Sequence, residues 1–362
     1  MSQKNILLVH DYNPTFHVGG GGVVHLNSDL ALWLRRNGFL VKMSVPQCCE
    51  MCDVREQDLI HFLRPQHKLK ELRNLVRQSE CVVVSVSERF RATAQAALHY
   101  ARALHRPYVV WIHTRLSHTY FTMPQGRALK RAVMSPYCRA VVCVSRAVLG
   151  DVKTNFGSLP HAHTVYPGVY QAQRFEQATT IPDQGGIDVL FSGRLCREKG
   201  GDIFIQALGE LAKEGVRPRV VMMGDGEEKR ALIGLAKELG VFSSLSFVPT
   251  GTRSELFARI RHARIFCVAS RSESFSITLA EALALGATVV APDTGGPREI
   301  TGSGEFGYLF KTGDAHDLAR ALRVALSQKR LHVLAQKLHA IQKFDAARQF
   351  RSLARIITQY YV

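Results

Sequence analysis

Short, continuously apolar runs alternate along the chain with longer stretches in which apolar residues recur at helical spacing. The first pattern is typical of strands buried on both faces of a parallel sheet, and the second of the helices that cover it. The pattern therefore predicts an α/β protein. The expected strands are Asn5–His10, Phe39–Val45, Cys81–Val86, Tyr108–His113, Ala140–Ser145, Ile187–Gly193, Arg219–Gly224, Leu245–Pro249, Arg264–Ser270 and Thr288–Asp293.

The alternation is interrupted near Thr164–Gly168, and a polar stretch then runs to about Gly186. We interpret this interruption as the boundary between two Rossmann-like, doubly wound parallel-sheet domains. Two such domains joined by a short linker are expected to face each other across a cleft. Ligands of open parallel sheets bind outside the carboxyl ends of the strands, so candidate site residues are sought there.

Two carboxylates stand eight positions apart between the last two expected strands. Glu273 falls in a loop, and Glu281 falls in a helix predicted from Ser276 to Leu285. A helix that starts after a parallel strand presents free N–H groups and a positive dipole end, which suit a phosphate. Carboxylates beside it suit the hydroxyls of a sugar or ribose. A structural helix cap explains the same residues when they are considered alone.

The segment Ser192–Gly201 also follows an expected strand and precedes a helix. Within it, Arg194 and Lys199 combine a guanidinium fork with a point charge, and this combination suits a diphosphate. The alternative is a solvated basic loop.

Three further features lie at expected strand ends. Gly19–Gly22 follows the first strand and opens a helix, which fits a loop that approaches a phosphate or sugar, or a flexible turn. It does not match the dinucleotide fingerprint, so no nicotinamide cofactor is expected. His113 ends an apolar strand, where it is either a satisfied core residue or a residue that faces a ligand. For Gly224–Glu228, a turn with a helix cap is the preferred interpretation, and a ligand-binding loop is the alternative.

The 362 residues carry 47 Lys and Arg against 30 Asp and Glu, a formal net charge of +17. Through Pro167 the counts are 21 and 10, so most of the excess lies in the first half. This charge indicates an anionic partner, which is a membrane surface, a charged acceptor or nucleic acid. No apolar run approaches the roughly 18 residues of a membrane span, and the N-terminus lacks the hydrophobic core of a signal peptide. A cytoplasmic location is therefore expected.

The cysteines mostly stand in expected strands or helices, as reduced core residues do. Cys48, Cys49 and Cys52 are the exception, and His61 and His67 follow them. The group could bind zinc, but its spacing matches no zinc-ligand pattern well, so reduced loop cysteines are the simpler interpretation.

The segment His67–Gln78 is basic and amphipathic, and Gln125–Arg131 adds three more cations. Such a helix either lies on an anionic membrane or packs its apolar stripe on its own sheet. The sequence leaves both interpretations open.

Taken together, the motifs resemble the large retaining family of GT-B glycosyltransferases usually called GT4. The matching features occur in the family's order: the glycine loop, a Gly-Arg-x4-Lys-Gly element at Gly193–Gly200, a Gly-Asp-Gly turn at Gly224–Gly226, and a Glu-x7-Glu element at Glu273–Glu281. The linker Val165–Val169 and the final helix are also similar. The resemblance implies an acceptor-binding domain at residues 1–167, a donor-binding domain at 168–345, and a helix at 346–362 that returns to the first domain.

The resemblance implies transfer of a hexosyl-type sugar from a nucleoside diphosphate sugar, UDP-sugar by default, to an anionic or lipid-linked glycan acceptor in glycan biosynthesis. Arg194 and Lys199 would hold the diphosphate, Glu273 the donor-sugar hydroxyls and Glu281 the ribose, while His113 would sit near the transferred sugar. The other implied donor-binding residues are Gly20, Gly21, Gly22, Gly224, Asp225, Val248, Pro249, Ser274, Phe275 and Ser276. The family often has glycine at the positions of Ser274 and Ser276, and the two serines could make the sugar pocket tighter.

The implied mechanism needs no essential divalent ion, because Arg194, Lys199 and the helix N-terminus would stabilise the charge of the leaving group. Retention of configuration follows from the resemblance, and a same-face attack is the working hypothesis. The alternatives are a nucleotide-sugar 2-epimerase or hydrolase of the same fold, a catalytically inactive partner subunit, and a nucleic-acid-binding protein. The last of these lacks a reader motif.

Overall fold

The computed structural model describes residues 4–10, 22–46, 60–63, 67–87, 92–169, 186–328 and 333–359. The chain divides into two compact units. Unit 1 comprises Met1–Gly168 and Ala346–Val362, and unit 2 comprises Val169–Asp345.

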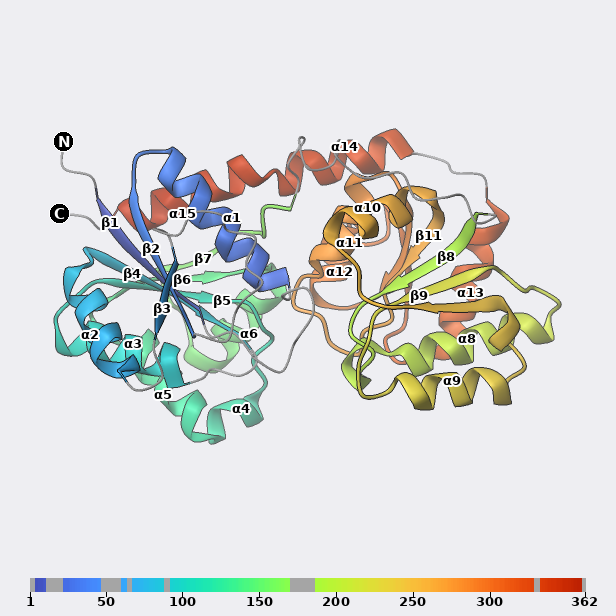
Figure 1. Ribbon diagram of the computed structural model, residues 1–362, viewed down its shortest axis with the longest axis horizontal. Helices are drawn as coiled ribbons and strands as arrows, with labels where there is room; N and C mark the ends of the chain where they lie inside the picture. Colours follow the sequence, from blue (N-terminus) through green and yellow to red (C-terminus); the bar gives the residue numbers. More distant parts are fainter. Residues whose placement is uncertain are drawn as a thin grey trace. The chain divides into compact units, whose positions relative to one another are not determined.

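The described part of unit 1 is built on a seven-stranded parallel sheet in the order β3-β2-β1-β4-β5-β6-β7. Helices α2, α3 and α5 lie together on one face of this sheet, and α1 packs with α15 on the other (Figure 1). The strands are β1 (Asn5–His10), β2 (Leu40–Pro46), β3 (Ile60–Leu63), β4 (Cys81–Val86), β5 (Tyr108–Ile112), β6 (Cys138–Cys143) and β7 (Ala162–Thr164). The helices are α1 (Gly22–Arg36), α2 (Lys68–Gln78), α3 (Ala92–Ala103), α4 (His118–Thr122), α5 (Pro124–Val133), α6 (Arg146–Phe156) and α15 (Ala346–Thr358).

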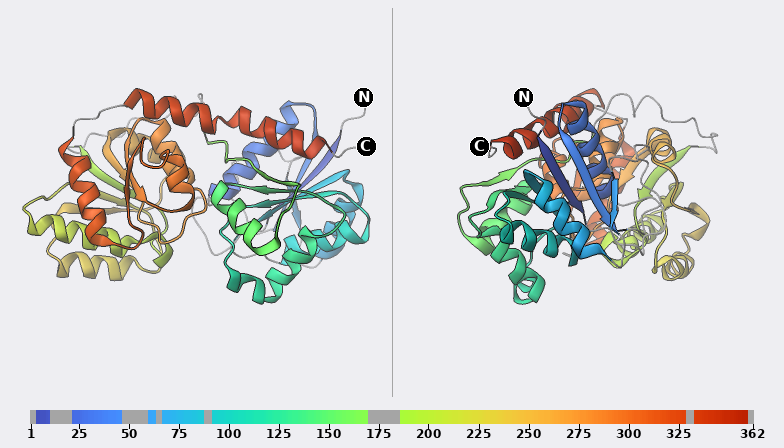
Figure 2. Two further views of the ribbon diagram at one scale, coloured as in Figure 1. Left: turned by 180° about the vertical axis from the view of Figure 1, so that it is seen from behind. Right: turned by 60° about the vertical axis from the view of Figure 1, so that its left-hand side comes forward.

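The described part of unit 2 holds a six-stranded parallel sheet in the order β10-β9-β8-β11-β12-β13. Helices α8, α9 and α13 cover one face, and α10, α11 and α12 cover the other (Figures 1 and 2). The strands are β8 (Ile187–Ser192), β9 (Val220–Met223), β10 (Leu245–Val248), β11 (Ala263–Cys267), β12 (Thr288–Pro292) and β13 (Tyr308–Phe310). The helices are α8 (Gly201–Lys213), α9 (Lys229–Glu238), α10 (Arg253–His262), α11 (Ile277–Ala284), α12 (Gly295–Ile300), α13 (Ala315–Ser327) and α14 (Val333–Phe344), with short 3-10 turns η1 (Arg197–Lys199) and η2 (Phe242–Ser244).

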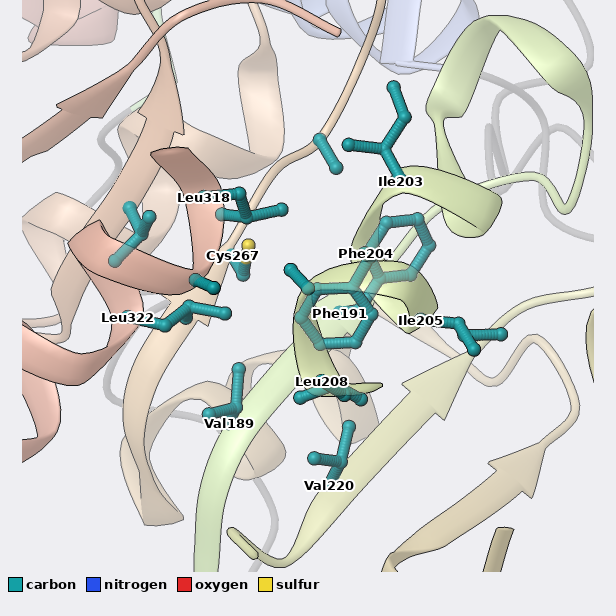
Figure 3. Close-up of a cluster of buried hydrophobic side chains, with 14 of the residues drawn as sticks. Val189, Phe191, Ile203, Phe204, Ile205, Leu208, Val220, Cys267, Leu318 and Leu322 are labelled. Carbon is teal, nitrogen blue, oxygen red and sulfur yellow. The ribbon is translucent and has the colours of Figure 1, made fainter. Parts of the chain in front are cut away.

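The core of unit 2 lies between β8, α8 and α13 (Figure 3). Phe191 of β8 stacks on Phe204 of α8 with 5.3 Å between ring centroids, and both side chains are buried. Leu318 and Leu322 of α13 contribute to the same cluster. Each of these large apolar side chains stabilises the fold by roughly 1.5–3 kcal/mol when it is fully buried. This packing fixes the end of β8, from which the candidate site begins.

The chain passes between the units at two places. Gly168 lies so close to Ala346 within unit 1 that a Cβ atom at Gly168 would stand 2.6 Å from the Ala346 Cα. Within unit 2, the Val169 N–H donates to the Phe344 carbonyl at 3.0 Å. Both passages of the chain are therefore held by contacts inside the unit to which they belong.

The expected strands all occur, with ends that differ by up to three residues, and the α/β class with two doubly wound sheets is confirmed. Among the described residues, no helix is long and apolar enough to cross a bilayer.

Candidate functional site

The strand order of unit 2 reverses between β8 and β11. After β8 the chain adds β9 and β10 on one side of it, and it then returns to add β11, β12 and β13 on the other side. All these strands are parallel, so their carboxyl ends share one edge of the sheet. The edge beside such a reversal is where ligands of open α/β sheets bind. The loops after β8 and β11 carry Lys199 and Glu273 to this edge.

Lys199 and Glu273 form an ion pair across the reversal point. The Lys199 Nζ lies 2.7 Å from the Glu273 Oε2, and the Ser270 hydroxyl donates to the same oxygen at 3.3 Å. Burial alone would lower the pKa of Lys199, but the charge and hydrogen bond of Glu273 outweigh it and raise that pKa. The charge of Arg194 acts against this increase, which places the Arg194 guanidinium in the same electrostatic environment. The structure thus joins Lys199 and Glu273 directly, and Arg194 is near enough for its charge to act on Lys199.

Glycines allow the loops of this edge to touch backbone to backbone. Gly200 has a φ of +67°, and a Cβ atom there would stand 2.0 Å from the Ala269 carbonyl oxygen. A Cβ atom at Gly224 would stand 1.9 Å from the Gly193 carbonyl oxygen. Only glycine fits such approaches without displacing the neighbouring chain. Gly200 of the Gly-Arg-x4-Lys-Gly element and Gly224 of the Gly-Asp-Gly turn therefore each have a structural reason to be glycine.

Arg271 ties the loop after β11 to the loop after β8 and to the start of α8. Its guanidinium bonds both carboxylate oxygens of Asp202 in α8, at 2.8 and 2.6 Å, and donates to the Arg197 carbonyl at 2.7 Å. The hydrogen bonds from Arg271 lower the pKa of Asp202. A bidentate pair of this kind fixes orientation as well as charge, so it holds Lys199 and Glu273 in register.

Ser274, Phe275 and Ser276 lead from Glu273 into α11, which begins at Ile277. Ser276 precedes the first helical residue with a φ of +79°, its side chain makes no cap bond, and it is buried. Phe275 is buried and packs edge-on against Phe344 at 5.3 Å. The first N–H groups of any α-helix lack partners inside the helix, so this end presents donors at the edge that holds Glu273.

Glu281 lies inside α11 and is 1% exposed. Its Oε1 accepts a hydrogen bond from Nη2 of Arg253, the first residue of α10. A buried carboxylate without a partner would be strongly destabilising, so this pair explains how the sequence tolerates an acid in a buried helix.

The loops after β9 and β10 complete the edge. The Gly224 N–H donates to the Val248 carbonyl at 3.0 Å, which joins the two loops. Asp225 is exposed, bonds the Gly226 N–H at 2.9 Å and lies 3.5 Å from the Lys229 Nζ. Pro249 follows β10 and is exposed.

His113 belongs to unit 1, where it follows β5. Its side chain is 8% exposed, its ring centroid lies 4.4 Å from that of Trp111, and its backbone N–H donates to the Val86 carbonyl. Within the described ranges, the Nε2 atoms of His113 and of His10, the last residue of β1, are buried without a hydrogen-bond partner. Burial lowers the pKa of His113 to about 3, with a further contribution from His10, and burial lowers that of His10 to about 4. Both rings are therefore neutral at pH 7.

Several sequence predictions fall on other parts of the chain. Gly20 and Gly21 lie outside the described residues, and Gly22 begins α1. The cluster Cys48–Cys52 also lies outside them, while His61 stands in β3 and His67 is an exposed residue before α2. Among the residues that the structure describes, no group of three or more His, Cys, Asp or Glu side chains is placed to hold a metal ion. Metal-independent chemistry stays a prediction.

Arg253, the Asp202–Arg271 pair and His10 are not among the residues predicted from the sequence. His10 carried the same signal as His113, a polar residue at the end of an apolar strand. Asp202 stands in the first turn of a predicted helix, where an acid is ordinary, and nothing in the sequence connects it with Arg271. Arg253 is one of many basic residues, and only the fold brings it to Glu281.

The fold and these residues agree with comparisons to known proteins. Residues 173–342 match the family described as glycosyl transferases group 1. The matched stretch makes up most of unit 2.

Curated relatives match over part of their length. A D-inositol 3-phosphate glycosyltransferase from Saccharomonospora viridis is 33% identical over 190 residues, which are 48% of this chain and 44% of the relative. A 2-deoxystreptamine N-acetyl-D-glucosaminyltransferase from Niallia circulans is 32% identical over 133 residues, which are 36% of this chain and 34% of the relative. The chain thus spans less than half the length of these two curated relatives.

Solved structures match over nearly the whole chain. HepE from Anabaena in complex with UDP-glucose has a TM-score of 0.81 at 17% identity, and the match covers 98% of this chain and 99% of HepE. A likeness at this identity shows the fold. The GT-B fold class predicted from the sequence is confirmed.

Proposed function

We propose that this protein is a retaining glycosyltransferase that moves a hexosyl-type sugar from a nucleoside diphosphate sugar, with UDP-sugar as the first candidate, to a carbohydrate acceptor. The observation that carries the proposal is the Lys199–Glu273 pair at the strand reversal of unit 2, with the charge of Arg194 beside it. The names of the curated relatives support glycosyl transfer, and the UDP-glucose bound in HepE supports a nucleotide-sugar donor.

The proposed reaction requires a place for negative charge that grows as the glycosidic bond breaks. Arg194, Lys199 and the N–H groups that begin α11 would meet the departing diphosphate. Groups already oriented toward developing charge stabilise a transition state without reorganisation. These groups would take the role that a divalent ion has in other transferases, so we expect turnover to continue when a chelator is present.

The carboxylates of Glu273 and Glu281 would each bind a different part of the donor. Glu273, held by Lys199 and the Ser270 hydroxyl, would accept hydrogen bonds from the donor-sugar hydroxyls. Glu281 would accept from the ribose. The linked loops that contain Gly224–Asp225 and Val248–Pro249 would flank the base.

We propose that unit 1 binds the acceptor. A pKa of about 3 keeps His113 neutral at physiological pH, so we assign it a neutral hydrogen-bonding role near the transferred sugar and acceptor. The glycine loop Gly20–Gly22 would contact the donor, as the resemblance implies.

The charge of unit 1 supports an anionic acceptor. Residues 89–150 hold ten Lys and Arg and no Asp or Glu. On α5, Arg127, Lys130 and Arg131 are exposed. The apolar stripe of α2 packs within unit 1, because Leu72, Leu75 and Val76 are buried. Unit 1 would therefore bind a membrane through its basic side chains rather than through this stripe.

The corresponding location for the protein is the cytoplasm, with peripheral contact at the inner face of the membrane. Co-sedimentation with anionic vesicles at low salt tests it, with neutral vesicles as the control. Substitution of the three α5 cations by glutamine should reduce binding. Equal binding of the triple variant would refute a role for this surface.

The proposed activity is tested by incubating the protein with UDP-, GDP- and ADP-sugars, and by measuring both the shift in melting temperature and the release of nucleotide. We expect one donor to raise the melting temperature, and acceptor glycans to accelerate nucleotide release. Nucleotide release that no acceptor changes would indicate a hydrolase or epimerase instead. The absence of any shift with every donor would contradict the proposal.

A further inference from the structure

Arg253 occupies a position that connects two parts of the proposed donor site. It is the first residue of α10, directly after the loop that follows β10, and its side chain reaches Glu281 inside α11. This inference rests on the proposed function, because the site in question is the nucleotide part of the donor site.

The local sequence fixes the position of Arg253. Thr252 and Glu255 form a reciprocal capping box, in which the Thr252 N–H donates to the Glu255 Oε2 at 2.6 Å and the Glu255 N–H donates to the Thr252 hydroxyl at 3.2 Å. Such a box sets where the helix begins and the direction in which its first side chain leaves. The Arg253 guanidinium also lies over the Phe257 ring, 5.4 Å from its centroid. The capping box and the ring of Phe257 therefore both restrict the position of the Arg253 side chain.

Glu281 depends on this partner more than a surface acid would. The exposed fraction of its side chain is 2%, and that of the Arg253 side chain is 24%. Burial disfavours an ionised carboxylate, and a cation in direct contact favours it. An ionised carboxylate only accepts hydrogen bonds, whereas a protonated one also donates. The ionisation state of Glu281 thus decides whether it can accept from two neighbouring hydroxyls.

The Arg253 guanidinium has a hydrogen-bond donor that the described residues do not use. Its Nε is buried without a partner among the described residues, so the guanidinium makes fewer hydrogen bonds than its shape allows. The Asp202–Arg271 pair of the same unit, by contrast, is bidentate. The Arg253–Glu281 pair carries the desolvation penalty of a buried ion pair and leaves one donor unsatisfied, so stabilising the fold is an incomplete explanation of it.

We propose that Arg253 is a positioning residue that keeps Glu281 ionised and oriented to accept hydrogen bonds from the ribose hydroxyls of the donor. Because α10 follows the β10 loop, the same residue links the loop proposed for the base to the carboxylate proposed for the ribose. Selection for ribose over deoxyribose then depends on Arg253, although Arg253 acts through Glu281.

Titration calorimetry with UDP and with 2′-deoxy-UDP tests this inference. In the wild type, UDP should bind about tenfold or more tightly than 2′-deoxy-UDP, because hydrogen bonds to a charged acceptor are strong. In Arg253→Gln the ratio should fall to less than about threefold, and UDP binding should weaken further as the pH is lowered. Arg253→Lys, which keeps the charge, should restore part of the ratio.

Further variants separate positioning from general damage. Glu281→Gln should lower the ratio as much as Arg253→Gln does, and the double variant should show no additional loss, because the two residues act as one unit. Arg323→Gln is the matched control, because Arg323 forms an exposed pair with Glu214 at 2.9 Å elsewhere in unit 2. If Arg253→Gln does not fold, Arg253→Lys and Glu281→Gln carry the test.

The outcomes distinguish the inference from the proposed function. An unchanged ratio in Arg253→Gln, with UDP still binding, would overturn the inference and leave the glycosyltransferase proposal intact. A wild type that binds UDP and 2′-deoxy-UDP equally would also overturn the inference. Failure of the wild type to bind UDP, GDP and ADP would remove the proposed function itself.

Discussion

Lys199 and Glu273 are 74 residues apart in the sequence, yet the Lys199 Nζ lies 2.7 Å from the Glu273 Oε2 at the strand reversal of unit 2. The pair leaves each side chain partly exposed, at 31% and 14%. A buried structural ion pair would be fully enclosed, whereas this pair is open to a ligand that exchanges one partner for a phosphate or a hydroxyl.

Replacing Lys199 should affect turnover far more than folding. In Lys199→Met, kcat with the preferred donor should fall about 100- to 1,000-fold, the usual effect of removing one group that stabilises transition-state charge. Lys199→Arg should recover part of the loss. Lys213→Met is the matched control, because Lys213 forms an exposed pair with Glu210. Full activity in Lys199→Met, measured by nucleotide release, would refute the catalytic role.

Gly200→Ala should disrupt the loop that carries Lys199. The φ of +67° and the 2.0 Å approach to the Ala269 carbonyl leave no room for a methyl group. We expect a loss of at least about 2 kcal/mol in the free energy of unfolding, together with weaker nucleotide binding. Gly234→Ala in α9 is the control, since a Cβ atom there meets nothing within 4 Å and should stabilise the helix by up to about 1 kcal/mol. Urea denaturation of both variants measures the difference, and equal stabilities would contradict this account of the loop.

The two serines before α11 should respond in opposite directions to glycine. Ser276 has a φ of +79°, so Ser276→Gly relieves backbone strain and should leave stability unchanged or raise it by up to about 1 kcal/mol. Ser274 does not have a positive φ, so Ser274→Gly should cost about 0.5–1 kcal/mol through the entropy of the unfolded chain. Thermal unfolding of the two variants decides the matter, and a large loss in Ser276→Gly would show that its side chain is structurally required.

Unit 1 should lose stability in mild acid because His10 and His113 are buried and neutral. Their folded pKa values of about 4 and 3 lie below the usual value of 6.5, so only the unfolded chain takes up protons as the pH falls below 6.5. Stability is full above that pH and declines toward pH 4, with a loss of about 1.4 kcal/mol per histidine at pH 5.5 relative to pH 8. His10→Phe should make the decline shallower. A wild type that unfolds at the same urea concentration at pH 8 and pH 5.5 would contradict the burial of both rings.

The fold was predictable because its signals are local. Continuous apolar runs such as Cys81–Val86 mark buried parallel strands wherever they occur, and the interrupted pattern near Gly168 marks the change of unit. The short edge strands β3, β7 and β13 were missed, because three or four residues carry too little pattern to be distinguished from a loop.

The candidate site was predictable only as a set of separate motifs. Arg194, Lys199 and Glu273 stand at expected strand ends, and the parallel sheet then places them at one edge. The partner of Glu281 was not predictable in this way, because Arg253 has no motif of its own and its distance from Glu281 in the sequence says nothing about contact. A side chain whose role depends on tertiary contact has to be read from the fold.

Hydrogen–deuterium exchange with and without UDP tests the central claim most directly, because it locates the nucleotide without prior choice of a residue. We predict that UDP slows exchange in the loop at 193–200, in the linked loops at 224–228 and 248–253, and in the segment 273–281, which includes the first half of α11. Protection confined to unit 1, or no protection at saturating UDP, GDP or ADP, would contradict the assignment of unit 2 as the donor site.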